Sequence, residues 1–299
     1  MDQNIFDKPR NVMELATENV ITITQATKVV DCLRSMVDHN FRRIPIVDEK
    51  GKIQGIISAT DLVSFLSGKH KLVNEKYRGD LAAAVNADVE EIMEKNVVAV
   101  KNTDTWPDAL ELMVENEVGG CPVVDEQRTV IGIITERDIL RFLAAHTELK
   151  GRVSFYMTKN VLTASSNDSI GEIMRTMISK GFRRVPITDG DVFTGIVTTR
   201  EILRYFGEES FDLLTTGKIE KALKEPIGSI LRNPLRYREP LFCDPLDRIA
   251  NVSQVMLEKN YGVALVGKDD ETVEGILTEK DIMKFLYTKI FLPSWWKSS

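Results

Sequence analysis

The chain repeats one sequence pattern four times, and this repetition constrains its fold more than any other feature. The copies begin near Asn40, Asn116, Gly181 and Asn260, and the first reads NFRRIPIVDEKGKIQGIISATDLVSFL. Each contains an apolar segment, a charged turn, a second apolar segment that ends in Ser or Thr, and a helical stretch. A repeated segment of this length identifies the folding unit. We therefore expect four related units.

Each copy is expected to form a strand-helix-strand-strand-helix unit. The segments RIPIVD and IQGIIS are β-branched and continuously apolar, which is typical of strands with both faces covered. Val30, Leu33, Met36 and Val37 recur at helical spacing in the stretch before the first of them. The predicted fold class is α/β (α+β), built from units of roughly 50 to 60 residues.

The four copies alternate between two versions. Phe-Arg-Arg precedes the strand proline in the first and third copies, whereas glycine lies there in the second and fourth, at 119–120 and 262. Longer linkers join copies one to two and three to four, and a short one joins two to three. A duplicated pair explains both alternations. We therefore predict repeats at 11–68, 88–146, 152–208 and 226–288, paired into modules 1–146 and 152–288.

Composition excludes several classes of function. The 299 residues carry 45 acidic and 39 basic side chains, and this net charge of -6 argues against a broad nucleic-acid surface. No apolar run approaches the roughly 20 residues that span a bilayer, and no signal peptide opens the chain, so we expect a cytoplasmic protein without membrane contact. Cys32, Cys121 and Cys243 are scattered in apolar segments and are predicted to be reduced core residues rather than metal ligands.

Catalytic patterns are also missing from the sequence. The three histidines have no nearby nucleophile or metal-ligand pattern, and neither a P-loop nor a dinucleotide fingerprint occurs. An enzyme and a bound metal are therefore not expected.

A Ser/Thr-x-x-acid step ends the second strand segment of every copy. The steps are Ser58-Ala59-Thr60-Asp61, Thr135-Glu136-Arg137-Asp138, Thr198-Thr199-Arg200-Glu201 and Thr278-Glu279-Lys280-Asp281. For any single copy a helix-capping box is the favoured interpretation. A basic residue precedes the acid in three copies, and capping does not explain it. A cation and free amides at a helix start favour phosphate, while the acid can accept hydrogen bonds from a ribose diol.

The order and spacing of the four copies resemble tandem cystathionine β-synthase (CBS) domains, which pair into Bateman modules. Four copies in two modules are similar to the γ subunit of AMP-activated protein kinase, and especially to its stand-alone archaeal relatives. The resemblance covers about Asn11 to Leu286. It implies a disc-like assembly, as a monomer or homodimer, with AMP, ADP or ATP as regulatory ligand in clefts between paired repeats. It leaves room for an unidentified protein effector.

The resemblance also assigns roles to matching residues. Ribose falls on the acids Asp61, Asp138, Glu201 and Asp281. Phosphate falls on the rest of each step, namely Ser58, Thr60, Thr135, Arg137, Thr198, Arg200, Thr278 and Lys280. The resemblance also implies that the arginine pairs Arg42-Arg43 and Arg183-Arg184 bind phosphate. Favourable placement of cations at a solvated helix end explains these pairs as well. The implied site further includes Gly120, Pro45, Pro122 and Pro186. Adenine falls on Val20, Ile21, Thr22, Ile56, Val97, Val98, Ile133, Val161, Leu162, Thr163 and Ile196.

Departures from the family pattern rank the four sites. Glu201 is one methylene longer than the usual Asp, and the fourth copy has Leu265 in place of the strand proline. The first two copies are therefore the better candidates. S-adenosylmethionine or methylthioadenosine is an alternative ligand, but the arginine pairs favour phosphate over a sulfonium. A partner-binding or nucleic-acid scaffold is a further alternative, and the Trp295-Trp296 tail is expected to dock on its own chain or a symmetry mate rather than on another partner.

Overall fold

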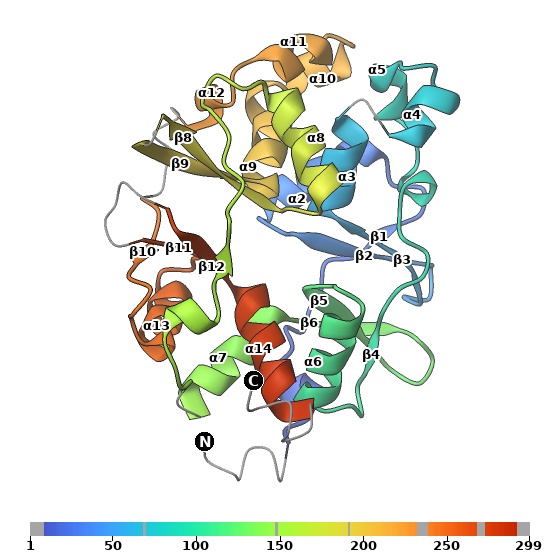
Figure 1. The fold of residues 1–299 in the computed structure, drawn as a ribbon. Coiled ribbons are helices and arrows are strands. Elements are labelled where there is room, and N and C mark those ends of the chain that lie inside the picture. The colour runs from blue at the N-terminus through green and yellow to red at the C-terminus, as the bar shows by residue number, and fades with distance from the viewer. Residues whose placement is uncertain are drawn as a thin grey trace. The chain divides into compact units, whose positions relative to one another are not determined.

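The computed structural model describes residues 9–67, 70–146, 149–190, 192–231, 239–267 and 273–291 (Figure 1). The Trp295-Trp296 tail lies outside them. The chain divides into two compact units, each of which contains two repeats. Unit 1 comprises Met1–Val20, Val98–Val161 and Pro240–Ser299, and unit 2 comprises Ile21–Val97 and Leu162–Glu239. Unit 1 thus holds the second and fourth repeats and unit 2 the first and third, while the pairing of consecutive repeats into modules stays a prediction.

Unit 2 contains the two repeats with paired arginines. The strands of the first repeat form a sheet in the order β1-β2-β3, with β1 parallel to β2 and β3 antiparallel to it. The first repeat and the linker after it comprise β1 (Ile23–Thr24), α2 (Val29–Asp38), β2 (Arg43–Val47), β3 (Ile53–Ser58), α3 (Ala59–Leu66), α4 (Lys71–Glu75), α5 (Leu81–Ala84) and η2 (Val89–Glu91). The third repeat and its linker comprise α8 (Ile170–Lys180), β8 (Arg184–Asp189), β9 (Val192–Thr198), α9 (Thr199–Arg204), the π-helix η4 (Tyr205–Glu209), α10 (Phe211–Thr215), α11 (Ile219–Lys224) and α12 (Gly228–Leu231).

Unit 1 repeats the same plan with glycine before its central strands. The second repeat comprises β4 (Val100–Lys101), α6 (Trp106–Glu115), β5 (Gly120–Val124), β6 (Val130–Thr135) and α7 (Glu136–His146). The fourth comprises β10 (Phe242–Cys243), α13 (Ile249–Glu258), β11 (Val263–Val266), β12 (Gly275–Thr278) and α14 (Glu279–Phe291). Short segments from elsewhere in the sequence complete the unit, namely η1 (Val12–Glu14), η3 (Val153–Phe155) and β7 (Thr158–Lys159).

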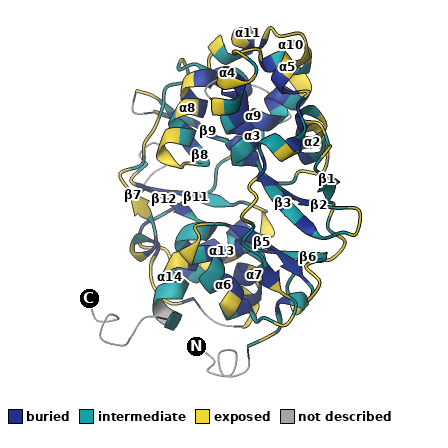
Figure 2. Cartoon of the chain, turned by 90° about the vertical axis from the view of Figure 1, so that its right-hand side faces the viewer, coloured by how far each residue is buried: buried dark blue, intermediate teal, exposed yellow. Residues whose placement is uncertain are grey.

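Burial follows the position of each strand in its sheet (Figure 2). The central strands β2 and β5 are buried almost throughout, as their continuously apolar sequences predict. The outer strands β3 and β6 alternate between buried and half-buried residues, because one face of each is less covered. Helices of the two repeats meet within each unit: α3 packs on α8 and α9 in unit 2, and α7 packs on α13 and α14 in unit 1. Each unit therefore has a hydrophobic core shared by its two repeats.

The segment that opens each repeat packs on a different repeat. Val12 is fully buried in the core around the second repeat, and Thr17 forms a β-bridge with Ile133 there. In the same way Glu94, which opens the second repeat, bridges to Ile56 of the first. β7, which opens the third repeat, pairs antiparallel with β12 of the fourth. This exchange explains why each compact unit is assembled from separate stretches of sequence.

In the first, third and fourth repeats a glycine in the second strand segment makes room for a neighbouring segment. A Cβ on Gly55 would lie 2.4 Å from the Met93 sulfur, and one on Gly275 would lie 2.8 Å from the Met157 sulfur. Gly195 would meet Leu231 in the same way, at 2.9 Å. The repeated Gly-Ile pattern therefore has a packing cause besides any role in binding.

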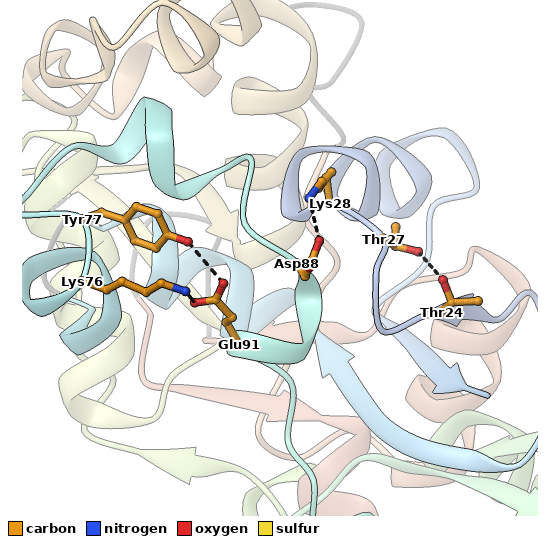
Figure 3. A network of polar contacts seen from close by, with 7 residues as sticks. All are labelled: Thr24, Thr27, Lys28, Lys76, Tyr77, Asp88 and Glu91. Atoms are coloured by element: carbon orange, nitrogen blue, oxygen red, sulfur yellow. Dashed lines mark hydrogen bonds and ion pairs between the residues drawn. The ribbon is translucent and has the colours of Figure 1, made fainter.

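Polar contacts hold the first long linker together, and one of them attaches it to the first repeat (Figure 3). Lys76 Nζ lies 2.5 Å from Glu91 Oε2, and the Tyr77 hydroxyl donates to Glu91 Oε1 at 3.2 Å. Lys28 Nζ, at the start of α2, lies 2.7 Å from Asp88 Oδ1. The linker forms the short helices α4, α5 and η2.

The three cysteines are buried and free, as expected for reduced core residues. Within the described ranges, every helix is too short or too polar to span a lipid bilayer. The same ranges contain no group of three or more His, Cys, Asp or Glu side chains arranged to hold a metal ion.

Candidate functional site

All four Ser/Thr-x-x-acid steps form helix caps. In the first repeat the backbone N–H and the hydroxyl of Ser58 both donate to Asp61 Oδ2 at 2.7 Å, and the Asp61 N–H donates back to Ser58 Oγ. Thr135 and Asp138 repeat the first two of these bonds at 2.9 and 2.6 Å. Thr198 with Glu201, and Thr278 with Asp281, do the same. The capping interpretation is therefore correct for every copy.

The cap occupies one oxygen of each carboxylate, and the fourth repeat shows what the second oxygen can do. Both cap bonds to Asp281 end on Oδ2. Its Oδ1 accepts a 2.9 Å hydrogen bond from the hydroxyl of Thr158, which lies on the exchanged strand β7. Asp138 Oδ1 has a weaker partner, since Arg141 lies 3.4 Å away. A capping acid at this strand-helix junction can thus bind an additional hydroxyl group.

Sheet register brings the arginine pairs to the same junction. Arg43 is paired across the strands with Ser58, and Arg184 is paired with Thr198. The N–H of Ala59, the first residue of α3, donates to the carbonyl of Arg42, the residue before Arg43, at 2.9 Å. In the second repeat Gly120 occupies the corresponding place opposite Thr135. Further candidate site residues are paired along the same strands, namely Pro45 with Ile56, Pro122 with Ile133 and Pro186 with Ile196. Residues predicted from separate motifs therefore share one edge in each repeat.

Electrostatics at this edge distinguishes the first two acids. Burial raises the pKa of Asp61, partly offset by its hydrogen bonds from Ser58, while Glu94 raises it further and Arg43 lowers it. Burial likewise raises the pKa of Asp138, against the bonds from Thr135 and the charge of Arg141. A partly buried carboxylate has lost part of its hydration, and the neighbouring groups replace it only incompletely. An added hydroxyl donor therefore stabilises the charged form of the carboxylate strongly.

The basic residues before the acids contact a different repeat of the same unit. Arg137 Nε lies 2.5 Å from Glu279 Oε1, while its Nη2 is buried without a hydrogen-bond partner among the residues that the structure describes. Arg200 Nη1 donates to Asn40 Oδ1 at 3.1 Å. Lys280 Nζ lies 3.9 Å from Glu117 Oε1, and Thr60 is half-buried. Their assignment to phosphate stays a prediction, and the orphaned nitrogen of Arg137 is the feature that most favours it.

The segments predicted to hold adenine expose apolar surface. Ile21 and Leu162 occupy equivalent positions in the segments that open the first and third repeats, and they are 37% and 38% exposed. Thr22 is half-buried and Thr163 exposed, and the valines of these segments at 20, 97, 98 and 161 are half-buried. Because β1 runs parallel to β2 from Ile23, Ile21 and Thr22 lie toward the arginine end of β2. Such a segment provides an apolar contact near a polar edge, as ligand sites commonly do.

Sequence reasoning missed four residues that bind the predicted groups. Thr158 bonds the acid of the fourth step, and Glu279 bonds the basic residue of the second. Asn40 and Glu117 bond basic residues of the third and fourth steps. Their partners lie in another repeat, so no local spacing could reveal them. One signal was available: Asn40 and Glu117 both lie five residues before the strand proline of their repeat. In the structure both lie two residues after a helix and have positive φ, 57° and 55°.

Comparison with known proteins places these features in a family. The CBS domain model matches residues 12–68, 89–145, 152–208 and 235–288. A 33.4 kDa protein of the ribosomal RNA operon of Thermofilum pendens is 33% identical over 265 residues, which cover 87% of this chain and 86% of that protein.

Solved structures show the same fold along the chain. Protein MJ1225 of Methanocaldococcus jannaschii is described as a candidate archaeal homologue of γ-AMPK. It superimposes on this chain with a TM-score of 0.85 at 29% sequence identity, and the match covers 93% of this chain and 100% of MJ1225. A conserved protein of Pyrococcus horikoshii has a TM-score of 0.59 at 21% identity, over 93% of this chain and 100% of its own, and shares the fold. With four domain matches along its length and the fold of MJ1225, this chain belongs to the CBS domain family.

Proposed function

We propose that this chain is a regulatory protein that binds the adenine nucleotides AMP, ADP or ATP at the strand-helix edges of its repeats. Membership of the CBS domain family and the likeness to MJ1225, described as a candidate homologue of γ-AMPK, support this proposal. Asp61 and Asp138 bind ribose hydroxyls in the two best sites. The arginine pair of the first repeat and Arg137 of the second bind phosphate.

The Thr158–Asp281 hydrogen bond carries the proposal. It demonstrates, at one of four equivalent edges, that a capping acid accepts a hydroxyl on its second oxygen. The residues equivalent to Thr158 are Glu94 beside the first edge and Thr17 beside the second, and both Asp61 and Asp138 are partly buried. In this proposal a ribose hydroxyl takes, at these two edges, the place that the Thr158 hydroxyl has at the fourth. The fourth edge is occupied by the protein itself.

Regulation follows if the ligand binds one arrangement of the protein more tightly than another, since differential affinity alone shifts such an equilibrium. The buried acids provide the discrimination. A ligand without sugar hydroxyls leaves them uncompensated, so adenine by itself binds weakly.

Thermal unfolding with AMP, ADP, ATP, S-adenosylmethionine and methylthioadenosine tests the proposal. A ligand at 100 times its dissociation constant stabilises the protein by about 2.7 kcal/mol. Stabilisation by a phosphate-bearing nucleotide is expected. Stabilisation by methylthioadenosine but not by AMP would show that the site binds the sulfur-containing ligands instead. If none of the five ligands stabilises the protein, the proposal is refuted.

The ribose assignment has a matched control within the chain. Thr105 and Asp108 form a capping box of the same geometry at α6, with bonds of 2.8 and 2.6 Å to Asp108 Oδ2, away from the repeated step. Asp138→Asn and Asp61→Asn should each weaken nucleotide binding, measured by calorimetry, by about tenfold, the loss of roughly one hydrogen bond to a charged group. Asp108→Asn should leave binding unchanged. Equal affinities for all three variants would show that the acids only cap helices.

A further inference from the structure

The two most exposed large hydrophobic side chains of the described residues are neighbours in unit 1. Phe155 is 71% exposed and Leu246 is 62% exposed. The segments that carry them run side by side in opposite directions, because the N–H of Ser154 donates to the carbonyl of Pro245 at 2.9 Å and the preceding N–H donates to the carbonyl of Asp247 at 3.0 Å. The two side chains form a small apolar surface, which we call the Phe155–Leu246 patch.

The patch occurs at only one of four equivalent junctions between repeats. At each junction the N–H of an apolar residue donates to the carbonyl of a loop in another repeat, namely from Val12 to Asp104, from Val89 to Thr27, from Val153 to Asp247 and from Ile227 to Asp168. Counting from these bonds, the counterparts of Phe155 are Glu14, Glu91 and Ser229, and those of Leu246 are Thr103, Ala26 and Asn167. The same backbone therefore forms with polar or small side chains, and packing of the junction does not require the two large apolar ones. Exposed apolar side chains that are grouped on a surface commonly mark a contact site.

The size of the patch indicates what covers it. Two side chains supply only a part of the roughly 800 Å² per partner that a stable interface between folded surfaces buries. A second copy of the chain is therefore a poor fit as the occupant. A short segment with one or two large aromatic anchors fits a patch of this size better.

The chain passes beside the patch shortly before such a segment begins. Phe285 of α14 packs on Tyr156, the residue after Phe155, with the two ring centroids 4.0 Å apart. α14 ends at Phe291, six residues later, which corresponds to about 9 Å along the helix axis. The four residues from 292 to 295 can span about 13 Å when extended. The chain beyond α14 is therefore long enough to return to the patch.

The composition of this tail matches the patch. Trp295 and Trp296 supply two adjacent indole rings, and both belong to the stretch of sequence assigned to unit 1. Arg152 is exposed at the same junction, where it forms a β-bridge with Arg248. Guanidinium groups stack favourably on indole rings. The patch thus offers apolar contacts together with a cation suited to tryptophan.

We propose that Trp295 and Trp296 dock on the Phe155–Leu246 patch of the same chain. The indole rings lie against Phe155 and Leu246, and the guanidinium group of Arg152 lies over one of the rings. This inference does not depend on the nucleotide proposal, because no residue of the patch or of the tail belongs to a predicted nucleotide site.

Acrylamide quenching of tryptophan fluorescence tests the docking on the full chain. The chain has three tryptophans, so Trp106→Phe leaves only Trp295 and Trp296 to report. In this variant the tail should be quenched several times less than a synthetic peptide of residues 292–299, because docked rings are shielded from the quencher. Chymotrypsin cleavage after Trp295 and Trp296, followed by mass spectrometry, measures the same docking without the Trp106 substitution.

Variants of the patch have a matched control in the other unit. Phe155→Ser and Leu246→Asn introduce the residues found at the equivalent positions 229 and 167, so the junction should still fold. Each should lower the ratio of docked to free tail about tenfold, since each removes the burial of one large side chain. Quenching and tail cleavage should rise toward the values of the peptide. Val192→Ser removes a 57% exposed side chain from unit 2 and should change neither.

Dilution distinguishes docking on the same chain from docking on a second copy. Quenching should stay constant over an about 100-fold range of protein concentration, because an intramolecular contact does not depend on concentration. Shielding that is lost on dilution would assign the tail to a second copy and overturn the proposal. Equal quenching of the chain and the peptide, or unchanged quenching when Phe155→Ser and Leu246→Asn are combined, would also overturn it.

Discussion

The Arg137–Glu279 ion pair offers the sharpest test of how the repeats of unit 1 are joined. The two side chains are 17% and 4% exposed, and the pair links the first turns of α7 and α14. Glu279→Ala leaves the Arg137 guanidinium buried without its carboxylate, and its Nη2 already lacks a partner. Removing one member of a buried pair costs about 3–5 kcal/mol. Because Arg137 can turn partly toward solvent, we expect the lower end, about 3 kcal/mol.

Urea and thermal unfolding at neutral pH measure this loss. For domains of about 150–250 residues each kcal/mol lowers the melting temperature by about 2–4 °C, so Glu279→Ala should melt about 6–12 °C lower. Glu117→Ala is the matched control, because it also removes a glutamate paired with a basic side chain of α14 but is 72% exposed. An exposed pair contributes about 0–1 kcal/mol.

A double variant separates lost pairing from lost packing. Replacing both members by methionine removes the charges together and should restore the free energy of unfolding to within about 1 kcal/mol of the wild type. If Glu279→Ala is no more destabilising than Glu117→Ala, or if the double variant is as unstable as the single one, then the ion pair does not join these helices as described.

Three further changes test other parts of the structure. Val12→Ala removes buried methyl groups and should cost about 2 kcal/mol, with faster hydrogen exchange in the second repeat rather than the first, to which Val12 belongs in sequence. Burial raises the pKa of Asp61, so the folded state binds the proton of this carboxyl more tightly than the unfolded state does. As the pH falls through the folded-state pKa toward 3.8, the wild type should therefore become more stable relative to Asp61→Asn, as measured by urea unfolding. Glu91→Ala removes the contacts with Lys76 and Tyr77, and should accelerate proteolysis of the first linker while changing global stability by no more than about 1 kcal/mol.

Local patterns in the sequence were sufficient to predict the repeats and the edge of each one. Two continuously apolar segments with a charged turn between them identified the strand pairs, and the position of Ser58 after a strand identified a helix start. The pairing of Arg43 with Ser58 was not predicted, because a β-bulge between Ile46 and Val47 shifts the register by one residue from the one set at the turn. In the apolar segment that opens the first repeat, only Ile23–Thr24 pairs with β2.

Contacts between repeats could not be predicted in this way. The partners of Arg137, Arg200 and Asp281 are separated from them by 142, 160 and 123 residues. The same holds for the exchanged segments, since Val12 reads as the start of its own repeat and is buried in another. A pattern within one repeat specifies its strands and caps, but the choice of a partner repeat is encoded in complementary charges and sizes that become visible only when both surfaces are known.

The alternation of the four copies acquires a physical meaning at the junctions inside the units. Copies of the same version share a unit, and the first helical residue of each final helix is buried there. In unit 2 these residues are the neutral Ala59 and Thr199, whereas unit 1 has Glu136 and Glu279, the latter paired with Arg137. Combining one copy of each version would place Arg137 against a neutral side chain and leave a charge buried without its counterion, at a cost of several kcal/mol. The duplicated pair visible in the sequence thus also provides an electrostatic rule that matches like copies with each other.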